Sequence, residues 1–152
     1  MPASIAQERP DSPDATALIA ELDAQLDVLY PSESRHGYSV DKLLAQGVAF
    51  FVLREDGVPV ACGGVQIYGG RYSEVKRMYV RDAYRGRGYA KRVLEHLEEY
   101  TLSQGVTLLR LETGIHQVAA ISLYEGAGFT SIPPFGEYEE DPLSRFYEKV
   151  LR

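Results

Sequence analysis

The sequence predicts a mixed α/β fold in which helices cover both faces of one β-sheet. Strand-like apolar runs and helix-like apolar stripes follow one another in the order β-α-α-β-β-β-α-β-α-β-β, and no repeat or linker interrupts them. The 152 residues, 45% hydrophobic and 25% charged, suit one globular domain spanning residues 1–152. The clearest signals are a tight hairpin in the first half and a strand, glycine loop and helix in the middle.

The first third of the chain is expected to supply two helices before the main strands. The elements predicted there are a strand at 3–9, a helix at 13–29, a breaker-rich loop at 31–37 and a short helix at 40–46. Ser12 followed by Pro13 is typical of a helix start, because serine caps free N–H groups and proline suits the first turn. Ser39 is expected to cap the second helix in the same way.

The rest of the chain is expected to form most of the sheet. The predicted elements are strands at 48–53, 58–68 and 74–80, a helix at 87–104, a strand at 106–113, a helix at 116–126, and strands at 128–132 and 144–151. Asp56-Gly57 between two apolar runs indicates a hairpin, since both residue types tolerate positive φ. Gly105 is typical of the residue that ends a helix.

Residues 74–91 join a strand to a helix through the sequence Arg85-Gly86-Arg87-Gly88-Tyr89-Ala90. The two glycines remove Cβ atoms that would hold a ligand away from the backbone, and the first turn of a helix leaves N–H groups unpaired. Residues 71–92 hold eight basic and two acidic side chains in a chain of net charge −6. The pattern indicates a site for a phosphate or pyrophosphate, and a solvated basic helix start is the alternative.

Several other function classes are disfavoured by the same sequence. The glycine loop lacks the third glycine of a dinucleotide-binding fingerprint, and no P-loop pattern is present. One basic island on an acidic chain argues against a nucleic-acid surface. Three histidines without ligand spacing argue against a metal site, and no apolar run is long enough to cross a membrane. A single cysteine, Cys62, and a polar N-terminus without a secretory signal lead us to expect a cytoplasmic location.

Two separate motifs carry a family resemblance. Arg85, Gly88 and Ala90 fit an R-x-x-G-x-A pattern, and residues 120–129 read A-I-S-L-Y-E-G-A-G-F. Together they resemble the GNAT superfamily of acyl-CoA-dependent N-acetyltransferases. The resemblance implies a mainly antiparallel, six- to seven-stranded sheet with helices on both faces, acetyl-CoA (coenzyme A) as the cofactor, and an amine as the acceptor.

The resemblance also implies which residues bind the cofactor. The amides of the loop at 85–90 would hold its pyrophosphate, and Gln117 stands where family members commonly carry asparagine near the pantetheine arm. The cofactor-binding residues expected are Met78, Tyr79, Val80, Arg85, Gly86, Arg87, Gly88, Tyr89, Ala90, Gln117 and Tyr124. Backbone N–H groups of the strand at 74–80 are expected to face the reacting carbonyl oxygen if the far edge of that strand is unpaired.

Two side chains are the candidate catalytic residues. An alkyl ammonium must lose a proton before it attacks the thioester, and the departing thiolate needs a proton donor. Tyr124 matches the motif tyrosine of the family and is expected to be that acid, with a core aromatic as the alternative. Glu74 is expected to be the base, because burial in an apolar strand would raise its pKa. The alternative is that Glu74 pairs with Lys76 or Arg71 and that catalysis proceeds through a bound water.

The acceptor is expected between the loops at 31–38 and 135–143. The substrate-binding residues expected there are Glu33, Arg35, His36, Arg77 and Tyr138. The three basic members of this set suit the carboxylate of an amino-acid-like amine. The acidic run at 137–141 suits a polyamine, an aminoglycoside or a lysine-bearing peptide, and solvated loops are the alternative interpretation of both.

Three functions remain open at this point. The favoured one is transfer of an acetyl group from acetyl-CoA to a primary amine of a small molecule, by direct attack in a ternary complex. The alternatives are acetylation of protein lysines or N-termini, and a non-catalytic coenzyme A-binding sensor domain, against which the presence of both Tyr124 and Glu74 argues. A homodimer is compatible with the tyrosine-rich C-terminal part of the chain.

Overall fold

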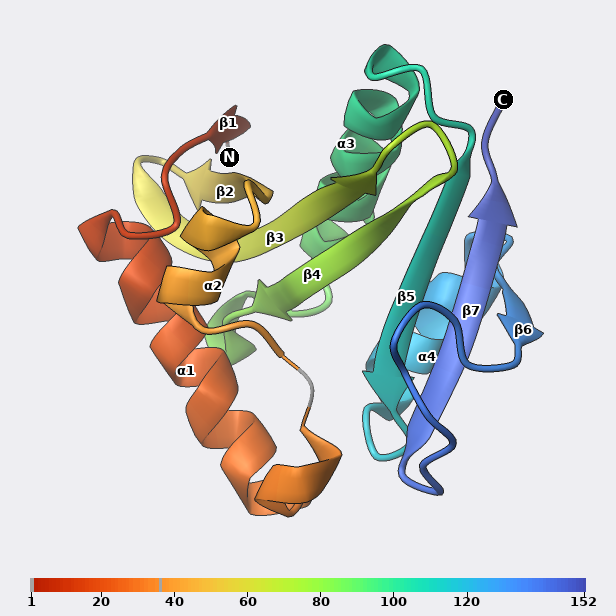
Figure 1. Ribbon diagram of the computed structural model, residues 1–152. Coiled ribbons are helices and arrows are strands. Elements are labelled where there is room, and N and C mark those ends of the chain that lie inside the picture. The colour runs from red at the N-terminus through yellow and green to blue at the C-terminus, as the bar shows by residue number, and fades with distance from the viewer. Residues whose placement is uncertain (1, 36) are drawn as a thin grey trace.

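The computed structural model describes residues 2–35 and 37–152 as one seven-stranded sheet with helices on both faces (Figure 1). The strands are β1 (Ala3–Gln7), β2 (Ala49–Glu55), β3 (Val58–Tyr68), β4 (Tyr72–Val80), β5 (Leu108–Gly114), β6 (Thr130–Ile132) and β7 (Ser144–Val150). The helices are α1 (Pro13–Leu29), α2 (Val40–Ala45), α3 (Tyr89–Ser103) and α4 (Val118–Gly126), with short 3-10 helices η1 (Ser32–Ser34) and η2 (Asp82–Tyr84). The predicted α/β class and order of strands and α-helices are confirmed.

The sheet is antiparallel except at one place. In the described chain the strand order is β1-β2-β3-β4-β5-β7-β6, and only β4 and β5 run parallel to each other. In this pairing Ser73 lies opposite Leu109 and Glu74 lies opposite Arg110. Beyond these residues β4 and β5 spread apart (Figure 1), so the sheet divides into two halves that are joined at one end.

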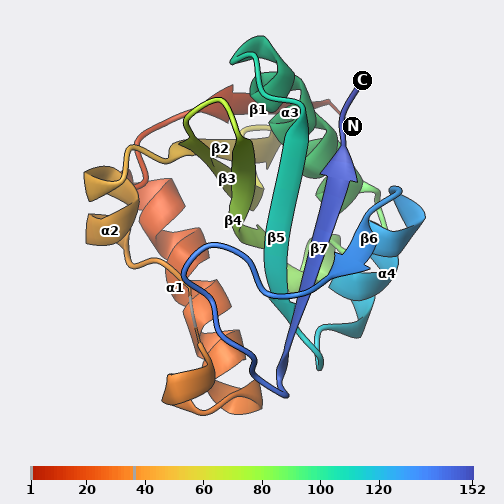
Figure 2. The same cartoon turned by 45° about the vertical axis from the view of Figure 1, so that its right-hand side comes forward.

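The helices form one layer on each face of the sheet. Helices α1 and α2 cover one face, and α3 and α4 cover the other (Figures 1 and 2). Val93, Leu94 and Leu97 of α3 are buried against the sheet because apolar residues recur at helical spacing. On the opposite face α1 packs Leu18 and Ile19 against apolar side chains of β2.

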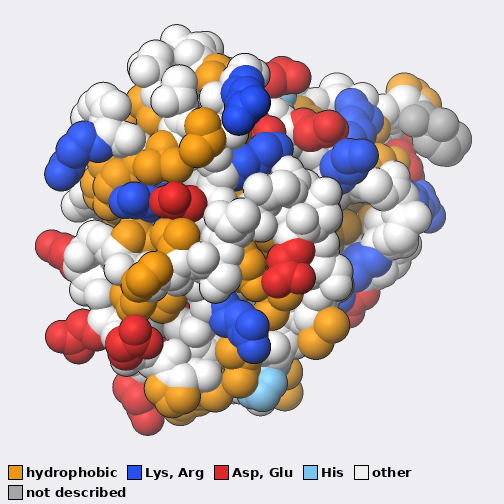
Figure 3. Space-filling view, turned by 90° about the vertical axis from the view of Figure 1, so that its right-hand side faces the viewer, with side chains coloured by type: hydrophobic (Ala, Val, Ile, Leu, Met, Phe, Trp, Pro, Cys, Tyr) orange, Lys and Arg blue, Asp and Glu red, His pale blue; other side chains and the backbone are white. Residues whose placement is uncertain are grey.

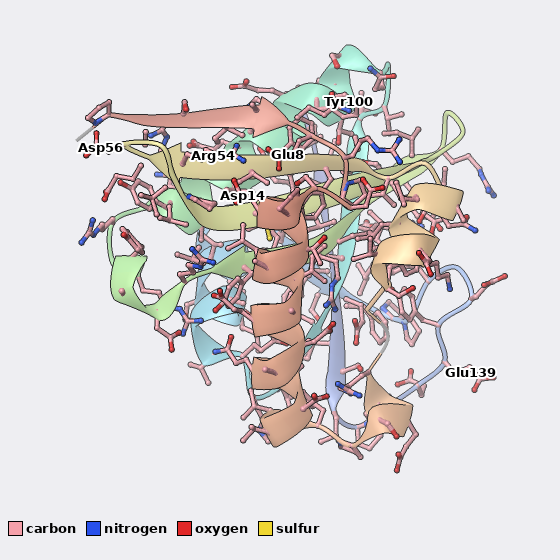
Figure 4. All side chains as sticks on the ribbon, turned by 90° about the vertical axis from the view of Figure 1, so that its left-hand side faces the viewer. Glu8, Asp14, Arg54, Asp56, Tyr100 and Glu139 are labelled. Carbon is pink, nitrogen blue, oxygen red and sulfur yellow. The ribbon has the colours of Figure 1, made fainter. Side chains whose placement is uncertain are left out.

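The local signals in the sequence act as predicted. The hydroxyls of Ser12 and Ser39 each accept a hydrogen bond from the backbone N–H three residues later, at 3.1 and 3.2 Å. Asp56 and Gly57, with φ values of 50° and 82°, form the tip of the hairpin between β2 and β3, where Figure 4 labels the aspartate. Capping serines and the Asp-Gly turn therefore set the ends of these elements.

Ion pairs fasten α1 to the sheet. Arg54 of β2 lies between Glu8 and Asp14 (Figure 4), with N–O distances of 2.9 and 2.8 Å. Further along the helix, Glu21 pairs at 2.7 Å with Arg81, which follows β4. Because α1 is held at both points, it forms a fixed wall beside the opening between β4 and β5.

The surface carries charges of both signs. Figure 3 shows the face formed by β7, β6 and α4, where acidic and basic side chains are interspersed among apolar ones. This face therefore has no broad region of a single charge. None of the helices within residues 2–35 and 37–152 has both the length and the apolar character that crossing a bilayer demands.

Candidate active site

Two cavities meet where β4 and β5 separate. The first, which we call the glycine-loop cavity, has a volume of about 500 Å³ and is lined by most of the loop at 85–90 and by α4. The second, the tyrosine cavity, has a volume of about 430 Å³ and is lined by Tyr30, Tyr38 and Tyr138. Residues that line both cavities are Leu22, Leu26, Met78, Gln117 and Tyr124. Compounds bound in the two cavities would therefore meet at this junction.

The glycine loop presents backbone donors to open space. Gly86 and Gly88 have φ values of 80° and 79°, which favour glycine, and a Cβ atom at either position would meet no atom within 4 Å. In the described chain α3 begins at Tyr89 without a side-chain cap, so the N–H groups of its first turn are available to a ligand. These donors and the helix dipole favour an anion, which suits a phosphate or pyrophosphate.

All residues expected to bind the cofactor line the glycine-loop cavity except Arg87. Arg87 instead pairs with Glu55 of β2 at 2.8 Å. The Tyr89 hydroxyl donates to the same carboxylate, and this hydrogen bond, followed by the one from Arg87, lowers the pKa of Glu55. Glu55 thus holds Arg87 against the end of β2 and leaves the backbone of the loop to face the cavity.

Tyr124 lies at the junction of the two cavities and is buried. Its ring packs edge-on against Phe129 with centroids 5.7 Å apart, so it also belongs to the core. Burial, followed by the negative charge of Glu112, raises the pKa of the Tyr124 hydroxyl. The hydroxyl therefore keeps its proton at neutral pH and can donate it. Gln117, beside it, accepts a hydrogen bond from the N–H of Gly114 at 3.0 Å.

Glu74 lies in the wall of the tyrosine cavity, where its carboxylate accepts hydrogen bonds from three side chains. Lys76 donates at 3.0 Å, Tyr138 at 2.6 Å and Tyr68 more weakly at 3.5 Å. Glu74 and Lys76 are both buried, and the Lys76 ammonium lies 3.8 Å from the centre of the Tyr38 ring. Burial, followed by the charge of Glu74, raises the pKa of Tyr138. Glu74 therefore pairs with Lys76, as the alternative interpretation expected, and also lines the cavity, and its role as a base stays a prediction.

A β-bulge in β4 directs Arg77 into the tyrosine cavity. The register between β3 and β4 shifts between Cys62 and Gly64, so Arg77 and Met78 both lie opposite Gly63. Arg77 adopts a φ of 56°, which is rare for a residue other than glycine. The strand expected to be regular is therefore interrupted at this point. Because β4 contains no glycine, nothing in its sequence predicts the bulge.

The other residues expected to bind the acceptor are only partly brought together. Arg35, Arg77 and Tyr138 line the tyrosine cavity. Glu33 is exposed on η1 and is not among the lining residues, and His36 lies outside the described residues. No cluster of His, Cys, Asp and Glu within the described ranges is arranged to hold a metal ion.

Lining residues that were not expected in the site include Lys76, Tyr30, Glu112, Asp23 and Asp27. Lys76 has a recognisable signal, because alternate residues of a strand share a face and Glu74 lies two positions earlier. Tyr30 has no such signal, since its place depends on how α1 crosses the sheet. Its hydroxyl accepts the N–H of His116 at 2.9 Å, which ties the end of α1 to the segment between β5 and α4.

Comparisons with known proteins assign the chain to a family and support its fold. Residues 15–129 match the family model described as acetyltransferase (GNAT) family. An Azospirillum brasilense protein named IAA acetyltransferase is 42% identical over 149 residues, which cover 97% of each chain. The structure of a proposed acyl-CoA N-acyltransferase from Klebsiella pneumoniae is 34% identical, with a TM-score of 0.85 over 99% of this chain and 98% of that chain. A GNAT family acetyltransferase from Elizabethkingia anophelis with acetyl-CoA bound is 14% identical, with a TM-score of 0.74 over 98% of both chains, a likeness of fold alone.

Proposed function

Because this chain belongs to the acetyltransferase (GNAT) family, and is an N-acetyltransferase that uses acetyl-CoA, we propose that its acceptor is the primary amine of a small molecule. The amine attacks directly in a ternary complex, with the donor in the glycine-loop cavity and the acceptor in the tyrosine cavity. The observation that carries this proposal is that both cavities are lined by Met78 and Tyr124. Direct transfer needs such a junction, because reacting atoms must approach to about 3–3.5 Å.

The size of the tyrosine cavity supports a small acceptor. Its volume of about 430 Å³ lies within the range of about 300–1,000 Å³ that is usual for small-molecule sites. The segment before β7 passes across the face of β5 (Figure 2), and its Tyr138 bonds to Glu74 on β4. Tyr138 of this segment lines the cavity, whereas a protein substrate would need an open groove there.

The residues of the glycine-loop cavity fit acetyl-CoA. The open backbone donors of the loop at 85–90 suit the pyrophosphate. Ala119, Ala120 and Leu123 of α4 provide an apolar lining for the arm that carries the thioester. When bound, acetyl-CoA supplies an acetyl group that is activated as a thioester.

Strand β4 supplies backbone donors at the junction. The N–H of Arg81 bonds to the carbonyl of Val60 on β3, and successive residues of a strand direct their N–H groups to opposite sides. The N–H groups of Val80 and Met78 are therefore directed to the side from which β5 has separated. Donors in this position stabilise negative charge that develops on the reacting carbonyl oxygen.

Glu74 and Tyr124 carry the two proton transfers in this proposal. The acceptor amine arrives mostly as an ammonium ion, and Glu74 takes its proton directly or through a water molecule. Lys76 and Tyr138, which both bond to Glu74, hold the carboxylate in place. Tyr124 keeps its own proton because burial raises its pKa, and donates it to the departing sulfur.

Release of free thiol from acetyl-CoA, measured with a panel of small primary amines and a panel of peptides, tests the proposal. We expect thiol release with members of the amine panel, with the N-acetyl product identified by mass spectrometry. Peptides that present a lysine or a free N-terminus should give no more than the hydrolysis background. Transfer to peptides but not to free amines would overturn the small-molecule acceptor and leave the family assignment intact.

A further inference from the structure

Arg77 has an unusual backbone position for a long charged side chain. Adjacent residues of a strand ordinarily face opposite sides of the sheet. The bulge and the φ of 56° turn Arg77 to the α1 face, where Lys76 also lies: Arg77 contacts Ile19 of α1, and Lys76 contacts Tyr38. Positive φ is unfavourable for residues with a Cβ atom, and bulges often re-aim side chains beside functional sites.

The guanidinium group of Arg77 is buried but keeps unused hydrogen-bond capacity. The side chain is 4% exposed and lines the tyrosine cavity. Its Nη2 donates to Asp23 and to the backbone carbonyl of Ile19. Its Nε is buried and, among the described residues, has no partner. Since a buried N–H without an acceptor is unfavourable, a ligand with a carboxylate would complete this group by accepting a hydrogen bond from Nε.

Arg35, which follows η1, repeats this arrangement beside the next turn of α1. It lines the same cavity, its Nη1 pairs with Asp27, and its Nε is buried without a partner in the described chain. Asp23 and Asp27 are four residues apart on α1, so they lie one turn apart on the same face of the helix. The two guanidinium groups that they hold therefore lie along one wall of the cavity.

The aspartates leave room for an incoming carboxylate. The side chains of Asp23 and Asp27 are 50% and 58% exposed, so solvent and salt weaken both ion pairs. The strand side of the cavity carries Glu74, which is paired with Lys76, and Glu112, so its carboxylates exceed its ammonium groups by one, and this excess favours an ammonium group. The α1 side of the cavity therefore offers two guanidinium groups in weakened ion pairs, and the strand side has one carboxylate in excess, which together match a molecule that carries both charges.

We infer that Arg77, assisted by Arg35, forms a carboxylate-binding subsite, and that the acceptor is an amino acid or a similarly small amine with an acid group. The inference rests on the proposed function and narrows it to one class of acceptor. Because Arg77 directly precedes Met78, the subsite lies close to the junction of the cavities. Because the amine must reach the junction while the carboxylate occupies the subsite, only a few bonds can separate the two groups of the acceptor.

Matched pairs of acceptors test the subsite. Each common L- and D-amino acid is compared with its primary amide, which keeps the amine and the side chain and removes the negative charge. We expect kcat/KM for the preferred acids to exceed that for their amides by about tenfold or more. The amine of an amide loses its proton more readily, so intrinsic reactivity favours the amide and the expected preference is opposite to it.

Variants of the two arginines locate the effect. Arg35→Gln is expected to lower the acid-to-amide ratio of kcat/KM by about tenfold, because it removes one charge-assisted contact. Arg77→Lys keeps the charge but loses the planar edge, and is expected to lower the ratio at least as much. Arg9→Gln removes a charge from an exposed ion pair outside both cavities and should leave the ratio unchanged.

A binding measurement separates recognition from turnover. The N-acetyl derivative of the best amino acid and the N-acetyl derivative of its amide are titrated into the protein without acetyl-CoA. Calorimetry should show tighter binding of the acid by about tenfold, and Arg35→Gln should abolish most of this preference. If a variant gives no heat of binding with either ligand, circular dichroism on the same sample shows whether the variant has unfolded.

Different results would contradict the subsite and the proposed function. Equal kcat/KM values for acids and amides, or a ratio that neither arginine variant changes, would overturn the subsite and leave amine acetylation in place. Acetylation of neutral monoamines without transfer to any amino acid would do the same. Absence of transfer to every free amine would refute the proposed function, and the subsite with it.

Discussion

The two cavities of this protein are built in different ways. The glycine-loop cavity is lined by backbone N–H groups, which two glycines and the start of α3 expose. The tyrosine cavity is built from side chains of α1, β4 and the segment before β7, which ion pairs and hydrogen bonds hold together. The proposed donor site therefore depends on local backbone conformation, and the proposed acceptor site depends on contacts between distant segments.

This difference implies that the two specificities can change independently. Side-chain substitutions in the tyrosine cavity alter what is acetylated without touching the donors of the loop at 85–90. Substitutions at the glycines alter donor binding without touching Glu74 or Arg77. The following variants test how far this independence extends.

The largest effect is expected at the glycine loop. Gly88→Trp should raise the dissociation constant of acetyl-CoA by at least about 100-fold, because the side chain would fill the open space before the loop and a φ of 79° disfavours it. Gly105→Trp is the matched control, since Gly105 has a φ of 77° and equally open surroundings beyond the other end of α3. Calorimetric titration measures both, and equal affinity of Gly88→Trp and the wild type would contradict the pyrophosphate site.

The junction of the cavities is expected to give the next largest effect. Tyr124→Phe should lower kcat by about 100-fold or more and change acetyl-CoA affinity by less than about threefold, because it removes a proton donor and keeps the ring. Tyr147→Phe is the control, since it removes a buried hydroxyl that bonds to Glu125 at 2.8 Å outside both cavities. A loss of kcat shared by both variants would contradict the specific role of Tyr124.

The pH profile tests the same hydroxyl without a substitution. Burial raises the pKa of Tyr124 above its ordinary value of 10.0, so the acid form persists through neutral and mildly alkaline pH. Wild-type kcat should therefore not fall between about pH 7 and about pH 9. A fall over that interval, with the protein still folded, would indicate a different proton donor.

Substitutions in the tyrosine cavity are expected to have smaller effects, which are measured as changes in the free energy of unfolding. Lys76→Met would leave the buried carboxylate of Glu74 without its ammonium partner and should lower the free energy of unfolding by about 3 kcal/mol. The double variant Glu74→Gln/Lys76→Met should recover about half of this loss, because no unpaired charge remains. Urea unfolding measures both, and a double variant as unstable as Lys76→Met would contradict the coupling. Acetyl-CoA affinity of the double variant should match the wild type.

The smallest effect is expected at Cys62, beneath the bulge. Its Sγ donates to the carbonyl of Arg77 at 3.5 Å, and burial raises its pKa to about 12. Cys62→Ala should lower the free energy of unfolding by about 1 kcal/mol and leave acetyl-CoA affinity unchanged. In the folded wild type the protonated, buried thiol should resist alkylation at about pH 8. Rapid alkylation under native conditions would show that this part of the sheet opens.

Most of the fold could be predicted because its signals act over a few residues. Ser12 and Ser39 cap the helices that follow them, and Asp56-Gly57 forms the turn that its positive φ values favour. The glycine loop follows the same rule, since a strand, two glycines and a helix start need no distant contact to create an anion site. Arg87 is the exception, because its position depends on Glu55 of another strand.

The tyrosine cavity, which is the proposed acceptor site, could be predicted only in part. Residues 31–38 and the segment before β7 were expected near it, and Arg35 and Tyr138 do line it. The bulge at Arg77 was not expected, because it depends on packing: at Gly63, a Cβ atom would overlap the sulfur of Met78 and the side chain of Val93.

The sequence by itself determined the α/β order, the anion-binding loop and the tyrosine of the family motif, because each depends on periodicity or on neighbours a few residues away. Only the tertiary structure decided that β4 and β5 separate, that Arg77 turns toward α1 and that Glu74 is shared by Lys76 and Tyr138. These features join residues far apart in the chain, and such contacts follow from how helices and strands cross and pack.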